Sequence, residues 1–541
     1  MAAYFIYTVK EKSLLQVFVF VALFFSVITS SCNKEKSPKK YFLAEESIYS
    51  TQNFNDLVLD STFLATFLQK KPTSDSIKAQ VKRFYVRRAY QCAWLNASGL
   101  THGCLVFYNQ LQNYSQDFAD TSLTNKRLDI LLAAVQTDEK QFLNNKNEVQ
   151  ELELLLTTTF FQYAEKAYSG SIKNTYNLEW FIPRKKKNYQ ILLDSLVSLS
   201  KGEEWQEPVN QYYIRLKEKL RQYRNMQQKG EFPAVITDKK TLSVGDTNVC
   251  LLNLKQYLSL TGDLTINDNT NLFTDTLAKA IQLFQHRMGL EENGKLNRAT
   301  ITELNKPIDF RIRQIMVNLE RLRWLPTEME KKYILVNIPA FKLYVFENQK
   351  RLFDMKVVVG KEATKTSIFK GSISQIILNP YWVVPKSIVR NEILPKISQN
   401  PDYLVNNNME IVNDNYRQRP GKNNALGKIK FLFPNNFSIY LHDTPAKTLF
   451  NQSKRTFSHG CIRIAEPRKL ADYLLRNNSI WTAEKIDGIL ATDNMTSIIV
   501  KPTVPVYIAY FTTWVDSAGQ VNFRNDLYNL DAKLIKEIFG E

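Results

Sequence analysis

The sequence predicts a multidomain α+β protein with a helical N-terminal scaffold, a small three-helix unit and a C-terminal β-sandwich that carries a capping insertion. Its 541 residues are too many for one compact core. Apolar residues recur at helical spacing in the first half and alternate at strand spacing after about residue 332. Hydrophobic residues make up 44% of the chain and charged residues 23%, which excludes a collagen-like, a wholly disordered or a many-pass membrane protein.

The N-terminus is typical of an export signal. Residues 1–31 contain two lysines, an apolar run over 14–28 and small residues that end at Cys32. This arrangement resembles a bacterial lipoprotein signal, in which Cys32 carries the lipid; an uncleaved N-terminal anchor is the alternative. The polar residues 32–40 are expected to be a tether. We therefore expect a periplasmic or cell-envelope protein, held at a membrane through its N-terminal lipid or anchor.

The composition also bears on partners. Lys and Arg number 71 against 53 Asp and Glu, a formal net charge of +18, which favours acidic partners without specifying a fold. The expected location argues against nucleic acid and favours cell-wall polymer. Five Cys in so long a chain do not make a disulfide framework. With only four His, any His-dependent chemistry has few candidates.

Residues 41–234 are predicted to be the helical scaffold. Apolar residues at i, i+3 and i+4 recur through this region, and Gly and Pro are sparse. One motif, His102-Gly103-Cys104, imitates a catalytic His-Cys pair. No second His lies within 100 residues of it, so we expect a loop and a structural thiol there.

Residues 235–308 are predicted to be the three-helix unit. The Gly245-Asp246 turn, the helical run over 280–285 and the Gly-rich stretch over 289–294 resemble the small peptidoglycan-binding domain. The resemblance implies binding to glycan or stem peptide; a generic helical connector is the alternative. Residues 309–331 then follow as an amphipathic linker helix, which ends near a Leu-Pro pair.

The chemistry-bearing residues lie in the β region, residues 332–500. In the strand predicted over 438–442, Tyr440 and His442 fall on one face, and the intervening apolar residues fall on the other. Sixteen residues later comes the run Ser458-His459-Gly460-Cys461. On an extended chain His459, Cys461 and Arg463 share one face.

These residue types suit cysteine acyl transfer. Cys461 is a thiol nucleophile whose pKa a nearby His or cation must lower, and Arg463 is such a cation. His442 or His459 can be the base, and the amides of Gly460 and Cys461 can meet an oxyanion. A zinc site made of both His and Cys461, or a purely structural cluster, are the alternatives. The His-before-Cys order argues against papain-like peptidases.

The spacing from His442 to Ser458-His459-Gly460-Cys461-x-Arg463 resembles the signature of the L,D-transpeptidases, the YkuD-type catalytic domain. The runs at 359–361, 379–385 and 426–435 match as well, and the order of scaffold, peptidoglycan-binding and catalytic regions is similar to the large multidomain members. Two positions depart from the pattern: Arg463 stands where many members carry Asn, and Thr366-Ser367 stands where Thr-Pro is usual.

The resemblance implies that Cys461 attacks a tetrapeptide stem, that D-Ala leaves, and that another stem's amine completes a 3→3 cross-link. His442 would be the general base and His459 and Gly460 would line the reacting centre, with no metal or cofactor. The residues expected to contact substrate are Arg463, Tyr440, Ser458, Trp382 and Tyr381. A salt bridge for Arg463, and core packing for Tyr440 and Trp382, are alternatives. Asp443 is expected to be a turn residue, with a direct charge role as the alternative.

Two rival functions remain at this point, an L,D-carboxypeptidase that uses water as acceptor and a non-catalytic peptidoglycan-binding lipoprotein. Carbapenems are expected to be covalent inhibitors, because they mimic the acyl donor. Residues 386–427 are predicted to cap the groove and to move on substrate binding, or else to be a solvated loop. The expected contacts in this cap are Tyr403, Tyr416, Arg417 and Arg419. Residues 501–541 are predicted to be a strand and tail that pack on the catalytic domain.

Overall fold

The structure is a computed structural model that describes residues 55–230 and 232–540. The predicted signal 1–31, the lipidation site Cys32 and the tether 32–40 lie outside the described residues. Within the described part of the chain, no helix is long and apolar enough to cross a membrane.

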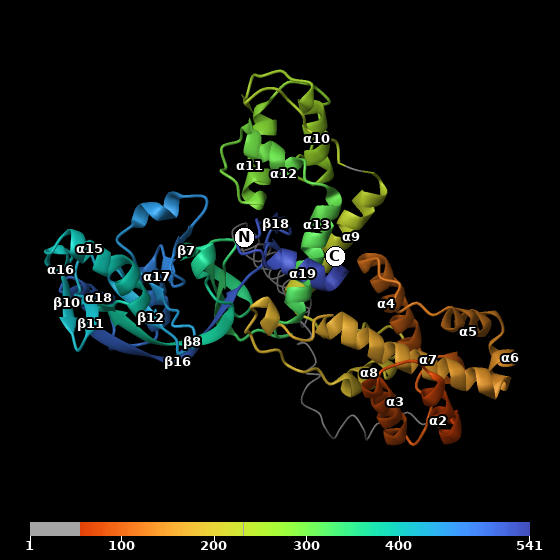
Figure 1. The fold of residues 1–541 in the computed structure, drawn as a ribbon. Helices are drawn as coiled ribbons and strands as arrows, with labels where there is room; N and C mark the ends of the chain where they lie inside the picture. Colours follow the sequence, from red (N-terminus) through yellow and green to blue (C-terminus); the bar gives the residue numbers. More distant parts are fainter. Residues whose placement is uncertain (1–54, 231, 541) are drawn as a thin grey trace, which may run out of the picture. The chain divides into compact units, whose positions relative to one another are not determined.

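The N-terminal part is helical, as predicted (Figure 1). Helix α7, Lys146–Ala164, has most of its side chains buried and contacts helices on several sides. Polar N-caps start most of the helices; the Asp60 carboxylate, for example, accepts a hydrogen bond from the Thr62 amide at the start of α2. The other helices are α2 Ser61–Lys70, α3 Asp75–Arg87, α4 His102–Phe118, α5 Lys126–Thr137, α6 Glu139–Asn144, α8 Tyr189–Val197 and α9 Gln211–Gln228, and a π-helical turn, η1, spans Glu165–Ser169.

The motif His102-Gly103-Cys104 forms the first turn of α4 and is not in a loop. The Cys104 thiol is fully buried, and burial raises its pKa far above the ordinary range. A ring nitrogen of His102 lies 3.2 Å from the carbonyl oxygen of Glu203. The prediction of a structural thiol is thus confirmed.

The three-helix unit contains α10 Cys250–Leu260, α11 Asp275–Met288 and α12 Arg298–Leu304, with a short pairing of β3 Thr241–Leu242 and β4 Leu296–Asn297. Gly289 ends α11 at a φ of 69°, a left-handed conformation that favours glycine. Inside the unit, the guanidinium of Arg287 forms a two-pronged ion pair with the Asp263 carboxylate, and both side chains are 3% exposed. This pair fixes α11 to the turn after α10.

Helix α13, Ile308–Arg323, follows. The sequence predicts an amphipathic linker, but the structure buries almost the whole helix, including several of its charged residues. The helix packs against α9 and α19, Leu530–Phe539. Its Arg, Glu and Asn side chains find partners inside the protein instead of solvent.

The C-terminal part is built on a nine-stranded mixed sheet, in the order β14-β7-β15-β13-β12-β8-β16-β5-β6. Strand β6 also pairs with β7. The ladder therefore closes on itself, so the two layers expected of a sandwich are one continuous sheet. The strands are β5 Lys332–Asn337, β6 Lys342–Glu347, β7 Lys350–Gly360, β8 Phe369–Leu378, β12 Ile429–Leu432, β13 Leu441–His442, β14 Thr456–Ser458, β15 Ile462–Ile464 and β16 Thr496–Ala509.

Strand β16 lies between β8 and β5, so residues 501–509, predicted to be a strand that packs on the catalytic domain, are an internal part of its sheet. Nearly every residue from Val504 to Phe511 is buried, so side chains on both faces of this strand are covered. This burial explains the central position of β16 in the sheet. The remainder of the C-terminus forms the hairpin of β17 Thr513–Val515 and β18 Val521–Phe523 and then α19. Helices α17 Pro467–Leu475 and α18 Ala483–Leu490 lie between β15 and β16 in the chain.

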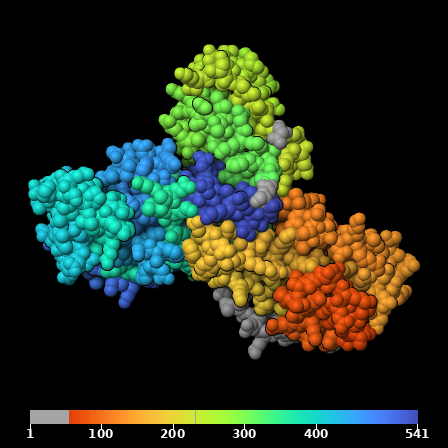
Figure 2. All heavy atoms as spheres, in the orientation of Figure 1, coloured from red at the N-terminus to blue at the C-terminus, as the bar shows by residue number. Residues whose placement is uncertain are grey.

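Residues 386–427 are structured. They contain α14 Lys386–Ile388, the π-helical turn η4 Val389–Ile393, α15 Leu394–Gln399, α16 Tyr403–Asn406 and the hairpin of β10 Met409–Val412 and β11 Asn415–Gln418. Strand β11 pairs with β9, Trp382–Val383, and a small core of Val384, Ile393 and Met409 holds these elements together. They gather at one end of the sheet in Figure 1 and make a continuous surface, in cyan, in Figure 2.

We expect the Asp263–Arg287 pair to be essential to the three-helix unit. Replacing Asp263 with Ala leaves a buried guanidinium without a partner, and we expect this to lower the opening free energy of peptides from 250–304 by about 3–5 kcal/mol. Hydrogen–deuterium exchange on the full chain measures that change. The control is Glu292→Gln, which removes the exposed partner of His286 and should cost under about 1 kcal/mol. Equal effects of the two variants would contradict the prediction.

Candidate active site

Cys461 lies in a turn between β14 and β15. His459, Gly460 and Cys461 are not in strand conformation, and Gly460 has a φ of 115°, which side chains rarely allow. The expectation that an extended chain aligns His459, Cys461 and Arg463 is therefore wrong. The bend at Gly460 places these side chains instead.

Ser458 organises this turn. Its hydroxyl donates to the carbonyl oxygen of Cys461 at 2.6 Å and accepts from the amide of Gly460 at 3.2 Å. Both the Ser458 hydroxyl and the Gly460 amide are thus used within the motif. Of the two amides expected to bind an oxyanion, that of Cys461 makes no hydrogen bond within the motif and is available for one.

The loop after β7 forms hydrogen bonds with the backbone of this turn. The Thr366 hydroxyl donates to the carbonyl oxygen of Gly460 at 2.8 Å and accepts from the amide of Gly360 at 2.9 Å. The Thr364 hydroxyl donates to the carbonyl oxygen of Ser458 at 3.1 Å. From the C-terminus, the Tyr528 hydroxyl donates to the carbonyl oxygen of Gly360 at 2.7 Å. Four bonds thus fix the backbone around the thiol.

His442 lies on β13, which runs parallel to β15 and places His442 opposite Arg463. The imidazole is 5% exposed, and its Nδ1 has no hydrogen-bond partner among the described residues. Burial lowers the pKa of His442 to about 3, and the charge of Arg463 is the second cause. The ring is therefore neutral at pH 7.

Asp443 is a turn residue. Its carboxylate accepts from the amide of Lys428 at 2.8 Å and pairs with the Lys447 ammonium at 2.5 Å. A side chain at Gly427 would collide with this carboxylate. Asp443 thus holds the turn that leads into β12, whereas the sequence predicted only a turn residue before Thr444-Pro445.

Tyr440 and His442 share one face, as the alternation predicted. Their ring centroids are 5.6 Å apart in an edge-to-face arrangement. The ammonium of Lys430, for which the sequence predicts no role, lies 3.9 Å from the centroid of the Tyr440 ring. Lys430 is opposite His442 in the β12–β13 register. Only that register, which sequence does not give, brings Lys430 to the site.

The thiol of Cys461 is the centre of this group. Burial raises its pKa, while a hydrogen bond with the Tyr440 side chain and the charges of Lys430 and Arg463 act in the opposite direction. Because the net shift is upward, the resting thiol is neutral at pH 7. Its Sγ points to the carbonyl oxygen of Ser438 at 3.6 Å.

Arg463 and Lys430 carry positive charge without a counter-ion. Neither forms an ion pair within residues 55–230 and 232–540, and the Nε of Arg463 is buried without a partner. The salt-bridge alternative for Arg463 is therefore not seen. Burial lowers the pKa of both side chains. The pair makes an electropositive site beside the thiol.

His459 points to the cap. Its Nε2 lies 2.7 Å from the Glu392 carboxylate on η4, and both side chains are 41% exposed. Trp382 packs on the small core of the cap, and the Arg417 guanidinium lies 4.5 Å from the ring centroid of Tyr381. In the part of the chain that is described, no three His, Cys, Asp or Glu side chains converge on a position suited to a metal ion.

The four residues predicted to be cap contacts are used inside the cap. Arg417 and Arg419 both pair with Glu410 across the β10–β11 hairpin. Tyr403 and Tyr416 pack on the core of the cap. The cap therefore reaches the motif through Glu392, which sequence reasoning did not single out.

Comparison with known families agrees with this geometry. Residues 331–508 match the model described as "L,D-transpeptidase catalytic domain", and residues 79–220 match the "Scaffold domain". Residues 251–304 match the "Putative peptidoglycan binding domain". Residues 331–508 are thus similar to an L,D-transpeptidase catalytic domain. The recognition made from the sequence motif, and the multidomain α+β fold class, are thus confirmed.

A curated protein and several solved structures that are similar to this chain are also named as L,D-transpeptidases. The chain is 31% identical over 241 residues to a protein of Haemophilus influenzae named "Putative L,D-transpeptidase"; the match covers 41% of this chain and 48% of that protein. This chain thus spans about half the length of the curated relative. An L,D-transpeptidase structure from Stackebrandtia nassauensis is 14% identical, covering 51% of this chain and 96% of that one at a TM-score of 0.21. The structure of LdtMt1 in complex with imipenem is 16% identical, covering 33% and 59% at a TM-score of 0.20.

The neutral thiol of the L,D-transpeptidase domain gives a pH prediction. We expect the rate of Cys461 alkylation by iodoacetamide to rise only above the pH range of an ordinary cysteine thiol. Lys430→Met should move this rise to still higher pH, because it removes a charge that favours the thiolate. Peptide mapping distinguishes Cys461 from the buried thiols. The control is Lys428→Met, whose ammonium faces Asp493 at 3.3 Å; an equal shift in that variant would contradict the assignment.

Proposed function

We propose that this protein is an L,D-transpeptidase that forms 3→3 cross-links between peptidoglycan stems through a Cys461 thioester. One observation carries the proposal: the charges of two uncompensated cations, Lys430 and Arg463, act on the Cys461 thiol, and Arg463 is opposite the neutral His442 in the β13–β15 register, within residues that match an L,D-transpeptidase domain. The peptidoglycan-binding domain over 251–304 supports the same substrate class.

In the proposed first step, Sγ of Cys461 attacks the carbonyl carbon before the terminal D-Ala of a tetrapeptide stem. His442 accepts the thiol proton as the C–S bond forms. A neutral thiol and a neutral imidazole are the correct starting states for this transfer. The tetrahedral oxyanion lies at the free amide of Cys461. Collapse breaks the C–N bond, His442 returns the proton to the leaving nitrogen, and D-Ala departs.

In the second step, the side-chain amine of another stem attacks the thioester. His442 takes a proton from that amine as the C–N bond forms, collapse then breaks the C–S bond, and His442 returns the proton to the sulfur, which regenerates the Cys461 thiol and leaves a new amide. Lys430 and Arg463 are suited to hold the carboxylates of the stems, because both are cations without an internal partner. His459, which lies in the same turn, would face the substrate from the side of the cap.

We also propose a role for the cap, a location for the protein and a class of covalent inhibitors. Residues 386–427 would cover the groove and open for substrate, with the His459–Glu392 contact as the closure. The signal-like segment that ends at Cys32 supports an envelope protein with an N-terminal lipid or anchor. Carbapenems would acylate Cys461, because they present a strained acyl donor to the same nucleophile.

The decisive test is mass spectrometry of the protein incubated with disaccharide-tetrapeptide. We expect a dimer that lacks one D-Ala, and we expect Cys461→Ala to abolish it while binding to wall material persists. The control is Cys250→Ala, which removes a buried thiol outside the catalytic domain and should leave turnover unchanged. Tripeptide without dimer would make the protein a carboxypeptidase. Full activity of Cys461→Ala would overturn the proposal.

The contact between cap and motif gives a separate prediction. Glu392→Ala should raise the rate of Cys461 acylation by a carbapenem by up to about fivefold, because a half-exposed polar contact of this kind is worth about 0–1 kcal/mol. Stopped-flow absorbance measures that rate. Glu410→Ala removes a cap carboxylate that pairs only with Arg417 and Arg419, and it should have no effect. An unchanged or slower rate in Glu392→Ala would show that this contact does not restrain the cap.

A further inference from the structure

The scaffold contains a hollow that the transpeptidase chemistry does not use. Its volume is about 900 Å³, and it is formed by η1, the segment 170–173, the segment 184–187 and the end of α13. A smaller contribution comes from α3 and from the residues before α5. This size suits a ligand with several functional groups more than a single small ion.

The lining is strongly basic. Seven cations face the hollow against one carboxylate, Glu165. Two of the cations are compensated, since Lys166 pairs with Asp120 and Arg323 pairs with Glu320. The other five have no ion pair within the described residues: Lys173, Arg184, Lys185, Lys186 and Lys187. Uncompensated charges at one concave site attract an anion.

Two of these cations are held in place. Arg184 donates to the carbonyl oxygens of Ile172 and Lys173, which joins the two segments that flank the hollow. Lys187 donates to the carbonyl oxygen of Tyr168 at 2.5 Å. Burial lowers the pKa of Lys187 to about 7, with the Arg323 charge as the second cause. A bound anion would offset the repulsion between Lys187 and Arg323 and favour the charged form of Lys187.

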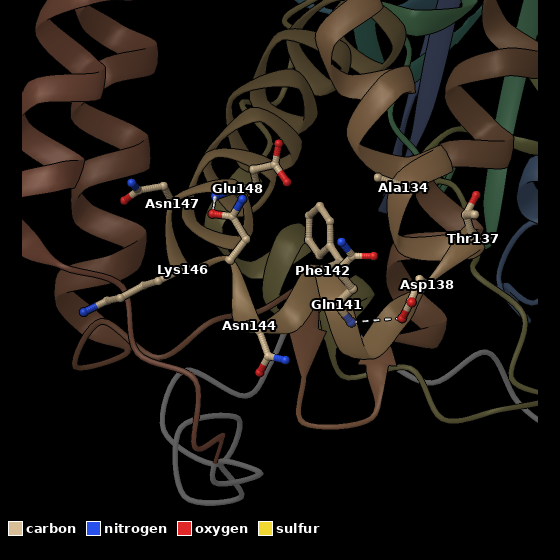
Figure 3. Close-up of a pocket in the computed structure, with 10 residues that line it drawn as sticks. Ala134, Thr137, Asp138, Gln141, Phe142, Asn144, Lys146, Asn147 and Glu148 are labelled. Atoms are coloured by element: carbon tan, nitrogen blue, oxygen red, sulfur yellow. Dashed lines mark hydrogen bonds between the residues drawn. The ribbon is translucent and has the colours of Figure 1, made fainter.

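A second hollow in the scaffold provides a contrast. It has about 740 Å³ and lies among α5, α6 and the start of α7 (Figure 3). Its charged lining residues are Lys146, Asp138 and Glu148, of which Asp138 caps α6. This lining has no excess of positive charge. The basic character of the first hollow is therefore not a general result of the +18 net charge.

We propose that the basic hollow, residues 165–187 with Arg323, binds a ligand that carries phosphate groups with at least two negative charges. Lysine ammonium groups act as mobile point charges for phosphate, and several of them can surround one multiply charged group. The hydroxyls of Ser169 and Ser171 lie in the same lining. A phosphorylated sugar in solution and the phosphate headgroup of a lipid share this chemistry.

The test is isothermal titration calorimetry of the full-length chain with fructose 1,6-bisphosphate and pyrophosphate, and with citrate as a polycarboxylate of similar charge. Cosedimentation with phosphatidylcholine vesicles, with and without phosphatidic acid, forms the lipid arm. We expect saturable binding in at least one phosphate arm and weaker binding of citrate. Binding only to the soluble phosphates identifies a free ligand, and binding only to phosphatidic acid identifies a headgroup; either outcome supports the proposal.

The variant K173Q/K185Q/K186Q removes three exposed charges that make no internal contact, so it should fold normally. We expect it to weaken phosphate binding at least about tenfold. The matched control is K70Q/K140Q/K229Q, which removes three exposed lysines away from the hollow. A second variant, K187M, should also lose affinity, with its melting temperature checked because Lys187 contacts Tyr168. The proposal is overturned if no phosphate probe binds, if citrate binds as tightly, or if the control loses as much affinity as the variant.

Discussion

The buried charges of α13 are the constraint on which the arrangement of the described chain depends. Arg311 pairs with Glu303 of α12, and Arg321 pairs with Asp531 of α19. Arg323 pairs with Glu320. A guanidinium buried without its partner costs several kcal/mol. The Arg311 and Arg321 pairs therefore form only when α12 and α19 take their places beside the helix.

This constraint extends from α13 to the catalytic turn. The Thr512 hydroxyl donates to the Asp531 carboxylate, and the amide of Thr512 donates to Asn318 of α13. The same C-terminal segment carries Tyr528, which holds the carbonyl oxygen of Gly360. Gly360 in turn binds Thr366, whose hydroxyl holds Gly460. A chain of hydrogen bonds thus connects the centre of the fold to the backbone beside Cys461.

The sequence predicted the parts of the site that depend on local spacing. The strand alternation placed Tyr440 with His442, and the spacing from His442 to Cys461 gave the motif. It did not predict Lys430 or Glu392, because their positions depend on the register of β12 against β13 and on the packing of the cap. The turn at Gly460 was missed because an extended chain was assumed where a positive φ is required.

The description of α13 as an amphipathic linker failed for a related physical reason. Arg, Glu and Asn at helical spacing are typical of a solvated face. Such residues are equally suited to a buried face when each one finds a counter-charge or a carbonyl oxygen. The partners, among them Asp531 and Thr512, lie about 200 positions away in the chain. Local periodicity carries no information on contacts of that range.

Under the proposed mechanism, the uncompensated cations explain how substrate prepares the base. Arg463 is the strongest charge acting on His442, whereas on Cys461 it is the weakest of the causes named. A substrate carboxylate that neutralises Arg463 therefore removes the strongest charge that lowers the pKa of His442. The higher pKa makes the imidazole a better acceptor for the thiol proton once substrate is bound. A shorter, neutral Asn at position 463 has no charge for a carboxylate to cancel, so this chain would couple proton transfer to carboxylate binding through its arginine.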